Sequence, residues 1–169
     1  MILVIGYGSE LRRDDAAGLR VAERVGGMGL PEVRSVVVHQ LTPDLAEPLS
    51  LVTHALFVDA WAGGRPGQVE VVPCPPVDLA APLGHVTRPQ ELLALTEAVF
   101  GRSPSAWMIR IPVADLGLGE GMTSEATVGV ERAVEAVQTL IAQWNRPEPE
   151  THSHPHHHHH PEAAGEGHP

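Results

Sequence analysis

The chain has 169 residues, a formal net charge of −10 at pH 7 and a single cysteine. The negative charge argues against nucleic acid or an anionic membrane surface as a partner, and one cysteine cannot form an internal disulfide, which agrees with a reducing compartment. All eleven positive side chains are arginines, so the chain has no lysine for a P-loop, a Schiff base or a Ser-Lys dyad.

Strands are predicted where apolar residues run together, and helices where they recur with helical spacing. In chain order, the predicted strands cover residues 2–5, 33–41, 54–59, 68–72 and 107–113, and the helices cover 14–25, a short segment from 42, 89–100 and 123–144. Only a tight turn precedes the fourth strand, so we expect that strand to be antiparallel. The alternation predicts an α/β fold, a three-layer α/β/α sandwich on a mainly parallel, roughly five-stranded sheet.

The length fits one domain, which we place at residues 1–146. From residue 147 the composition changes to Pro, Glu, Gly and His without apolar periodicity, so residues 147–169 are expected to form a disordered, His-rich tail. No stretch is apolar enough to span a bilayer, and the first residues lack a basic, signal-like region. We therefore expect a cytoplasmic protein without membrane insertion, and a monomer.

The turn after the first strand combines Gly6 and Gly8 with the acidic residues Glu10, Asp14 and Asp15. A glycine-rich turn between a strand and a helix often binds phosphate, but these carboxylates would repel it. The third glycine of the dinucleotide-binding fingerprint is also missing. The turn therefore suits a cation better than a nucleotide.

Three residues are expected to meet at the carboxyl edge of the sheet, where the loops of parallel strands converge. Asp15 follows the first strand, Asp59 ends the third, and His85 lies in a loop before a helix. Two carboxylates and an imidazole are a reasonable ligand set for a divalent metal ion. Some of these residues also have an ordinary structural interpretation. An acid at a helix start interacts with the helix dipole, which could apply to Asp15 and is how we interpret its neighbour Asp14. A loop histidine such as His85 often forms a hydrogen bond to the backbone.

Nothing in the sequence supports nucleophilic catalysis. Cys74 precedes two prolines and has no paired histidine motif, and no G-x-S-x-G turn occurs. His39 and His54 lie on or beside predicted strands, and we interpret both as structural.

These motifs resemble those of the hydrogenase maturation proteases, the endopeptidases that trim the large subunit of nickel-iron hydrogenases. Residues 5–18, IGYGSELRRDDAAG, are similar to the family's opening motif, Gly-x-Gly-Asn-x-Leu-x-x-Asp-Asp/Glu-x-x-Gly. The strand HALFVDA at 54–60, the Gly-His pair at 84–85 before a Leu-rich helix, and GEGMT at 119–123 before a long helix resemble later segments. The resemblance covers about residues 2–143. Ser9, Ala16 and the segment at 40–43 depart from it, and the segment at 40–43 indicates a subgroup with a different substrate surface.

The resemblance implies an endopeptidase that removes a C-terminal peptide from the nickel-loaded large-subunit precursor of a nickel-iron hydrogenase. It implies that Asp15, Asp59 and His85 form one metal site that meets the nickel held by the substrate, and other divalent ions can occupy such a site. Whether the metal polarises the scissile carbonyl, or Asp15 or Asp59 activates water, stays open. The alternative is a nickel-handling or chaperone-like assembly factor that binds metal without cutting the precursor. Ser9 and the His-rich tail are the features that favour this alternative.

The tail places eight histidines within residues 151–169. One interpretation is a purification tag. The other is a native segment that buffers or delivers nickel, because neutral imidazoles on a flexible backbone bind borderline ions well. We expect the second, with these auxiliary ligands: His152, His154, His156, His157, His158, His159, His160 and His168.

Overall fold

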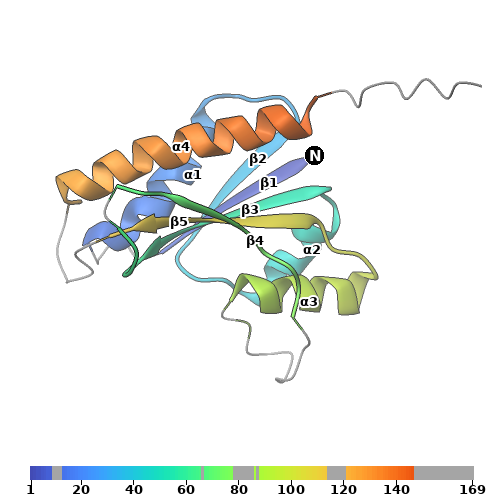
Figure 1. Ribbon diagram of the computed structural model, residues 1–169. Helices are drawn as coiled ribbons and strands as arrows, with labels where there is room; N and C mark the ends of the chain where they lie inside the picture. Colours follow the sequence, from blue (N-terminus) through green and yellow to red (C-terminus); the bar gives the residue numbers. More distant parts are fainter. Residues whose placement is uncertain (9–12, 66, 78–85, 87, 114–120, 147–169) are drawn as a thin grey trace, which may run out of the picture.

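The computed structural model describes residues 1–8, 13–65, 67–77, 86, 88–113 and 121–146. Its strands are β1 (Ile2–Tyr7), β2 (Val33–Val38), β3 (His54–Trp61), β4 (Glu70–Pro73) and β5 (Ser105–Pro112). They form one sheet in the order β2-β1-β3-β5-β4, in which only β4 runs antiparallel to its neighbour (Figure 1). The expected mainly parallel, five-stranded sheet is confirmed, including the reversed fourth strand.

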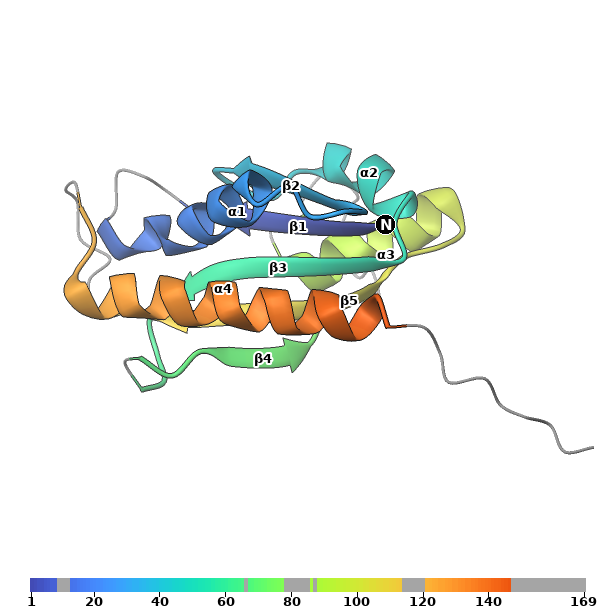
Figure 2. The same ribbon diagram turned by 90° about the horizontal axis from the view of Figure 1, so that it is seen from above.

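The helices form one layer on each face of this sheet (Figures 1 and 2). A 3-10 turn η1 (Arg13–Ala16) leads into α1 (Ala17–Gly27), and α1 covers one face together with α4 (Ser124–Trp144). The other face carries a second 3-10 turn η2 (Pro43–Leu45), α2 (Ala46–Ser50) and α3 (Pro89–Phe100). The predicted α/β/α sandwich is therefore confirmed.

Two hydrophobic cores lie on the two sides of the sheet. Alternate residues of β1 point into different cores: Ile2 and Val4 pack toward α1 and α4, whereas Leu3 and Ile5 pack toward α2 and α3. A strand covered on both faces must be apolar at every position, which explains the continuous run at the start of the chain.

Each strand differs from its predicted range at one end or both, and pairing explains where the second and third strands end. The second strand stops at Val38, because its last partner on β1 is Tyr7, where β1 itself ends. The third strand runs past Asp59 to Trp61, because its pairing with β5 continues to Pro112. Strand length is set here by neighbouring strands that are distant in sequence.

The glycines of the opening motif allow α1 to lie directly on the sheet. A Cβ atom on Gly6 would lie 2.3 Å from the carbonyl oxygen of Gly18, and one on Gly18 would lie 2.5 Å from that of Val58. Gly8 has a φ of +152°, and a Cβ there would lie 2.1 Å from the carbonyl oxygen of Asp15. These glycines therefore serve close backbone packing, which brings Asp15 against the end of β1.

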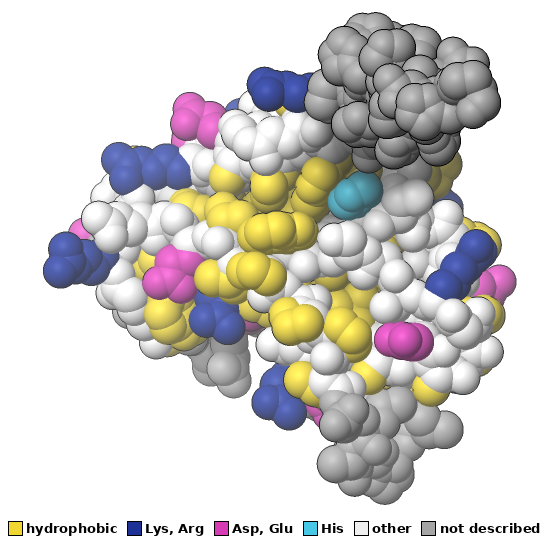
Figure 3. Space-filling model, turned by 45° about the vertical axis from the view of Figure 1, so that its right-hand side comes forward, with side chains coloured by type: hydrophobic (Ala, Val, Ile, Leu, Met, Phe, Trp, Pro, Cys, Tyr) yellow, Lys and Arg dark blue, Asp and Glu magenta, His cyan; other side chains and the backbone are white. Residues whose placement is uncertain are grey.

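One face of the molecule carries a band of hydrophobic side chains with charged side chains around it (Figure 3). Among the described residues, the most exposed large hydrophobic side chains include Leu51 after α2, and Val99 and Phe100 at the end of α3.

No helix within the described ranges is long and apolar enough to cross a membrane. The tail at 147–169 and its eight histidines lie outside the described residues.

Candidate functional site

The candidate site lies at the switch point of the sheet, where the chain begins to add strands on the other side of β1. The chain goes from β1 outward to β2, then crosses back to place β3 on the other side of β1. In open α/β sheets, the carboxyl ends of strands on either side of such a switch point form the ligand-binding crevice. Tyr7 ends β1, and Asp59 is the first residue of β3 beyond its last pairing with β1 at Gly6–Val58.

Asp59 is the most perturbed carboxyl group in the crevice. Its pKa is raised from 3.8 to about 6, chiefly because the group is buried and also because of the nearby charge of Asp15. The Tyr7 hydroxyl, the backbone N–H of Ala60 and the charge of Arg110 act in the opposite direction. A carboxyl group with a pKa near neutrality, in a crevice and beside a second acid, is a typical functional group.

Asp15 reaches the same edge from the opposite layer. It lies in η1, on the α1 side of the sheet, whereas Asp59 faces the side that α2 and α3 cover. The two carboxyl groups are nevertheless close enough for Asp15 to raise the pKa of Asp59. Two neighbouring carboxylates repel each other, and a divalent cation between them would relieve that repulsion. The structure therefore brings together two of the three residues predicted from the sequence.

The third predicted ligand, His85, lies outside the described residues. Among those that are described, no group of three or more His, Cys, Asp or Glu side chains is placed to hold a metal ion. Asp15 and Asp59 fit a divalent ion by their chemistry, as oxygen ligands that leave further positions open to other donors.

His54, interpreted as structural, and Cys74, set aside as a nucleophile, both lie in packed surroundings. His54 stacks on Trp144 at the end of α4, with 4.6 Å between ring centroids, and burial lowers its pKa. Cys74 is 2% exposed, and burial raises the pKa of its thiol to about 11, so it is a poor nucleophile near neutral pH. His39 is exposed after β2.

Asp14 has a larger structural role than the sequence suggested. Its carboxylate is fully buried and accepts hydrogen bonds from the backbone N–H of Thr123 at 2.8 Å and from its hydroxyl at 3.0 Å. Thr123 is the N-cap of α4, and its hydroxyl accepts a hydrogen bond from the backbone N–H of Ala126. The interpretation of Asp14 as acting mainly at its own helix was therefore incomplete, because its partner is 109 residues away.

We expect the change Asp14→Ala to lower the free energy of unfolding by about 3 kcal/mol, because two charge-assisted hydrogen bonds are lost in a buried place. Urea denaturation followed by circular dichroism measures the change. Thr123→Ser is the matched control, since serine keeps both the hydroxyl group and the cap. Equal stability of Asp14→Ala and wild type would contradict this role.

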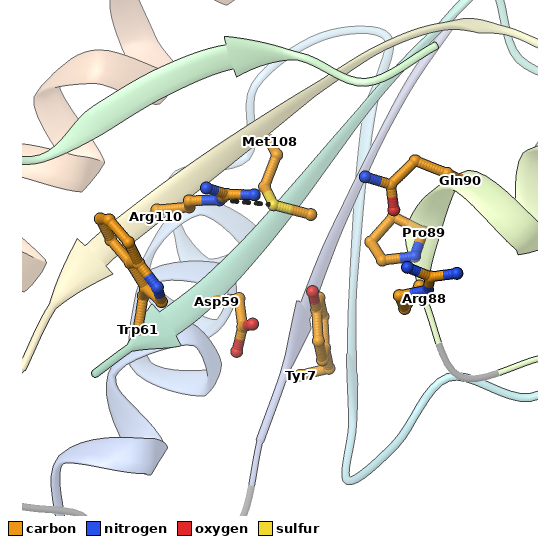
Figure 4. Close-up of a pocket in the computed structure, with 8 residues that line it drawn as sticks. All are labelled: Tyr7, Asp59, Trp61, Arg88, Pro89, Gln90, Met108 and Arg110. Atoms are coloured by element: carbon orange, nitrogen blue, oxygen red, sulfur yellow. Dashed lines mark hydrogen bonds between the residues drawn. The ribbon is translucent and has the colours of Figure 1, made fainter. Parts of the chain in front are cut away.

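A pocket of about 320 Å³ opens beside Asp59 toward the first residues of α3. Figure 4 shows Tyr7 and Asp59 side by side, Arg110 of β5 beside Trp61, and the α3 residues across from them. The sequence interpretation missed Tyr7 and Arg110. The available signal for Arg110 was an arginine inside the otherwise apolar strand at 107–113.

The sheet order, the switch point and the acidic crevice define an α/β/α protein with a carboxylate site at the edge of its sheet. No protein-family model matches the chain, and no curated protein matches it. Solved structures do match over most of its length. The hydrogenase maturation protease HycI from Thermococcus kodakarensis has a TM-score of 0.66 and 22% identity, over 83% of this chain and 92% of that one.

Two further structures agree. The hydrogenase maturating endopeptidase HybD from Escherichia coli has a TM-score of 0.66 and 21% identity, over 85% of this chain and 93% of that one. The hydrogenase 2 maturation peptidase from a Thaumarchaeota archaeon has a TM-score of 0.63 and 21% identity, over 83% and 97%. The fold of this chain is thus the fold of the hydrogenase maturation proteases.

Proposed function

We propose that this protein is an endopeptidase that removes a C-terminal peptide from the nickel-loaded large-subunit precursor of a nickel-iron hydrogenase. The observation that carries the proposal is the pair Asp15 and Asp59, which meets at the switch point of a sheet shared with known maturation proteases. A metal-binding crevice at this edge is what the motifs of the sequence predict.

In this proposal, Asp15, Asp59 and His85 hold the nickel ion that the substrate carries, so that nickel marks a precursor ready for cutting. A divalent ion there would polarise a carbonyl group or a water molecule. The carboxylates of this chain also offer a base for the proton of an attacking water molecule. Burial and the nearby Asp59 raise the pKa of the Tyr7 hydroxyl above its ordinary value, so the hydroxyl stays protonated. It donates a hydrogen bond to the Asp59 carboxylate and thereby orients it.

The nickel content of the precursor tests this proposal. We expect the protein to shorten nickel-loaded large-subunit precursor and to leave nickel-free precursor and casein intact, because recognition requires the metal. Gel electrophoresis separates the products. Efficient digestion of casein would contradict the proposed specificity, and a stable complex with uncut, nickel-loaded precursor would instead support an assembly factor that does not cut.

We further propose that the tail at 147–169 buffers or delivers nickel separately from this site. Truncation after Arg146 is expected to lower the number of nickel ions bound in a titration, because it removes eight imidazoles. The melting temperature and the cutting of preloaded precursor are expected to stay unchanged, since the tail has no apolar surface to bury. Unchanged nickel binding would refute the buffering role, and unfolding would refute the domain boundary at 146.

A further inference from the structure

Arg110 of β5 is a charged group in the pocket beside Asp59 that the proposed metal site does not use. It lines the pocket together with Trp61, and Arg88 lies across from it at the start of α3 (Figure 4). The pocket volume of about 320 Å³ lies at the lower end of the range for small-ligand pockets. An arginine that a strand places in such a pocket is a candidate binding group.

The guanidinium group of Arg110 is held from two directions. Its Nε donates to the sulfur of Met108 at 3.3 Å, and its central carbon lies 5.3 Å from the ring centroid of Trp61, a cation–π contact. The Trp61 ring in turn packs against the turn after β3. A Cβ atom on Gly63 would lie 2.7 Å from that ring, and one on Gly64 would lie 2.8 Å from it. The guanidinium is therefore positioned before a ligand arrives, which lowers the entropy cost of binding.

The positive charge of Arg110 is not neutralised within the part of the chain that the structure describes. Its register partners are Asp59 on β3 and Glu70 on β4, but neither forms an ion pair with it, and its terminal nitrogens have no hydrogen-bond partner there. Acidic residues outnumber basic ones in this chain by 21 to 11, so the missing ion pair does not come from a shortage of acids. A half-buried guanidinium without a counter-charge favours an incoming anion.

The charges that line the pocket also favour an anionic ligand. Two arginines, Arg88 and Arg110, are present with one carboxylate, that of Asp59. In the proposed function Asp59 shares a divalent ion with Asp15, and that ion would remove the repulsion between Asp59 and an anion. A neutral carbonyl oxygen would accept the same hydrogen bonds but would leave the positive charge unbalanced. Among the anionic groups of a protein, a carboxylate matches the two terminal donors of a guanidinium.

We propose that Arg110 binds a carboxylate group of the substrate precursor in the pocket beside Asp59. This inference rests on the proposed endopeptidase function and adds a binding residue to it. The carboxylate has one of two sources: an acidic side chain of the precursor, or the new C-terminal carboxylate that hydrolysis of the peptide bond creates. Both sources place the same group on the same donors, and binding of the uncut and cut forms distinguishes them.

Sodium acetate is the probe for the protein alone, and the NMR cross peak of the Trp61 indole N–H is the readout, because this ring contacts Arg110. We expect acetate to shift the peak saturably, with a dissociation constant on the order of 10 mM, and acetamide or sodium chloride at the same concentrations not to do so. Arg110→Gln is expected to weaken acetate binding at least about tenfold. Arg34→Gln, which changes an exposed arginine on β2, is the matched control and should bind as wild type does.

A second variant tests the sign of the ligand's charge. Asp59→Asn removes the negative charge beside Arg110, so we expect it to bind acetate about threefold more tightly. Equal shifts by acetate and acetamide, or equal acetate binding by wild type and Arg110→Gln, would overturn the assignment. Unchanged or weaker acetate binding by Asp59→Asn would also overturn it, and this result does not require Arg110→Gln to fold.

Titration with the uncut, nickel-loaded precursor and with the cut large subunit identifies the source of the carboxylate. If Arg110→Gln binds the precursor about tenfold more weakly than wild type does, the group is an acidic side chain. If only the cut subunit binds more weakly, the group is the new C-terminus. Unchanged binding of both forms would overturn a substrate carboxylate. Acetate binding does not depend on cutting, so a wild type that binds acetate at Arg110 but leaves the precursor uncut would overturn the protease and not the anion site.

Discussion

The change Asp59→Asn is expected to abolish processing of the nickel-loaded precursor, with a fall in kcat/KM of at least about 100-fold. An amide has nearly the same shape as a carboxylate, but it loses the charge that would hold a divalent ion and the base that would accept a proton. Single-turnover cleavage followed on gels measures the rate. Asp44→Asn, which changes an exposed acid on η2, is the matched control and should cut at the wild-type rate. Wild-type cleavage by Asp59→Asn would refute the site.

The same variant should keep its fold, and its stability has a defined pH dependence. The pKa of Asp59 is raised from 3.8 to about 6 in the folded protein, so ionisation of this group opposes folding. Its contribution to stability is fully present below the unfolded value and is lost as pH rises from about 4 through about 6. We therefore expect Asp59→Asn to gain stability relative to wild type between pH 4 and pH 7, as urea denaturation at both values would show.

The change Gly18→Ala is expected to lower the free energy of unfolding by at least about 3 kcal/mol, because the new Cβ cannot be accommodated without moving α1 away from the sheet. That atom would lie 2.5 Å from the backbone oxygen of Val58, and backbone cannot yield as a flexible side chain does. Gly27→Ala is the matched control, since a Cβ there meets nothing within 4 Å and should be neutral or slightly stabilising. If both variants unfold alike, α1 does not pack as closely as described.

The sequence predicted the fold well because the strongest local signals and the three-dimensional arrangement agree. The apolar runs form strands, and the segment Pro89–Phe100 forms a helix with the predicted ends. The rule that carboxyl ends of parallel strands share one edge was enough to bring Asp15 and Asp59 together. Asp15 lies beyond the end of β1 and Asp59 lies on β3, and the direction of both strands was predicted correctly.

The remaining features depend on contacts between distant segments. The two hydrogen bonds that Thr123 donates to Asp14 join η1 to the start of α4, and neither local sequence contains a sign of the other. Arg110 faces Asp59 only because β5 pairs with β3, and the order of strands in a sheet is not encoded by the periodicity of any one strand. Pairing thus decided which polar side chains share the crevice.

The most direct test of the central claim is the mass spectrum of purified, nickel-loaded large-subunit precursor after incubation with this protein. Hydrolysis of one peptide bond predicts two products, a large subunit shortened at its C-terminus and a released C-terminal peptide, whose masses add up to the precursor plus one water molecule. The precursor mass remaining unchanged while the protein is bound to it would contradict an endopeptidase.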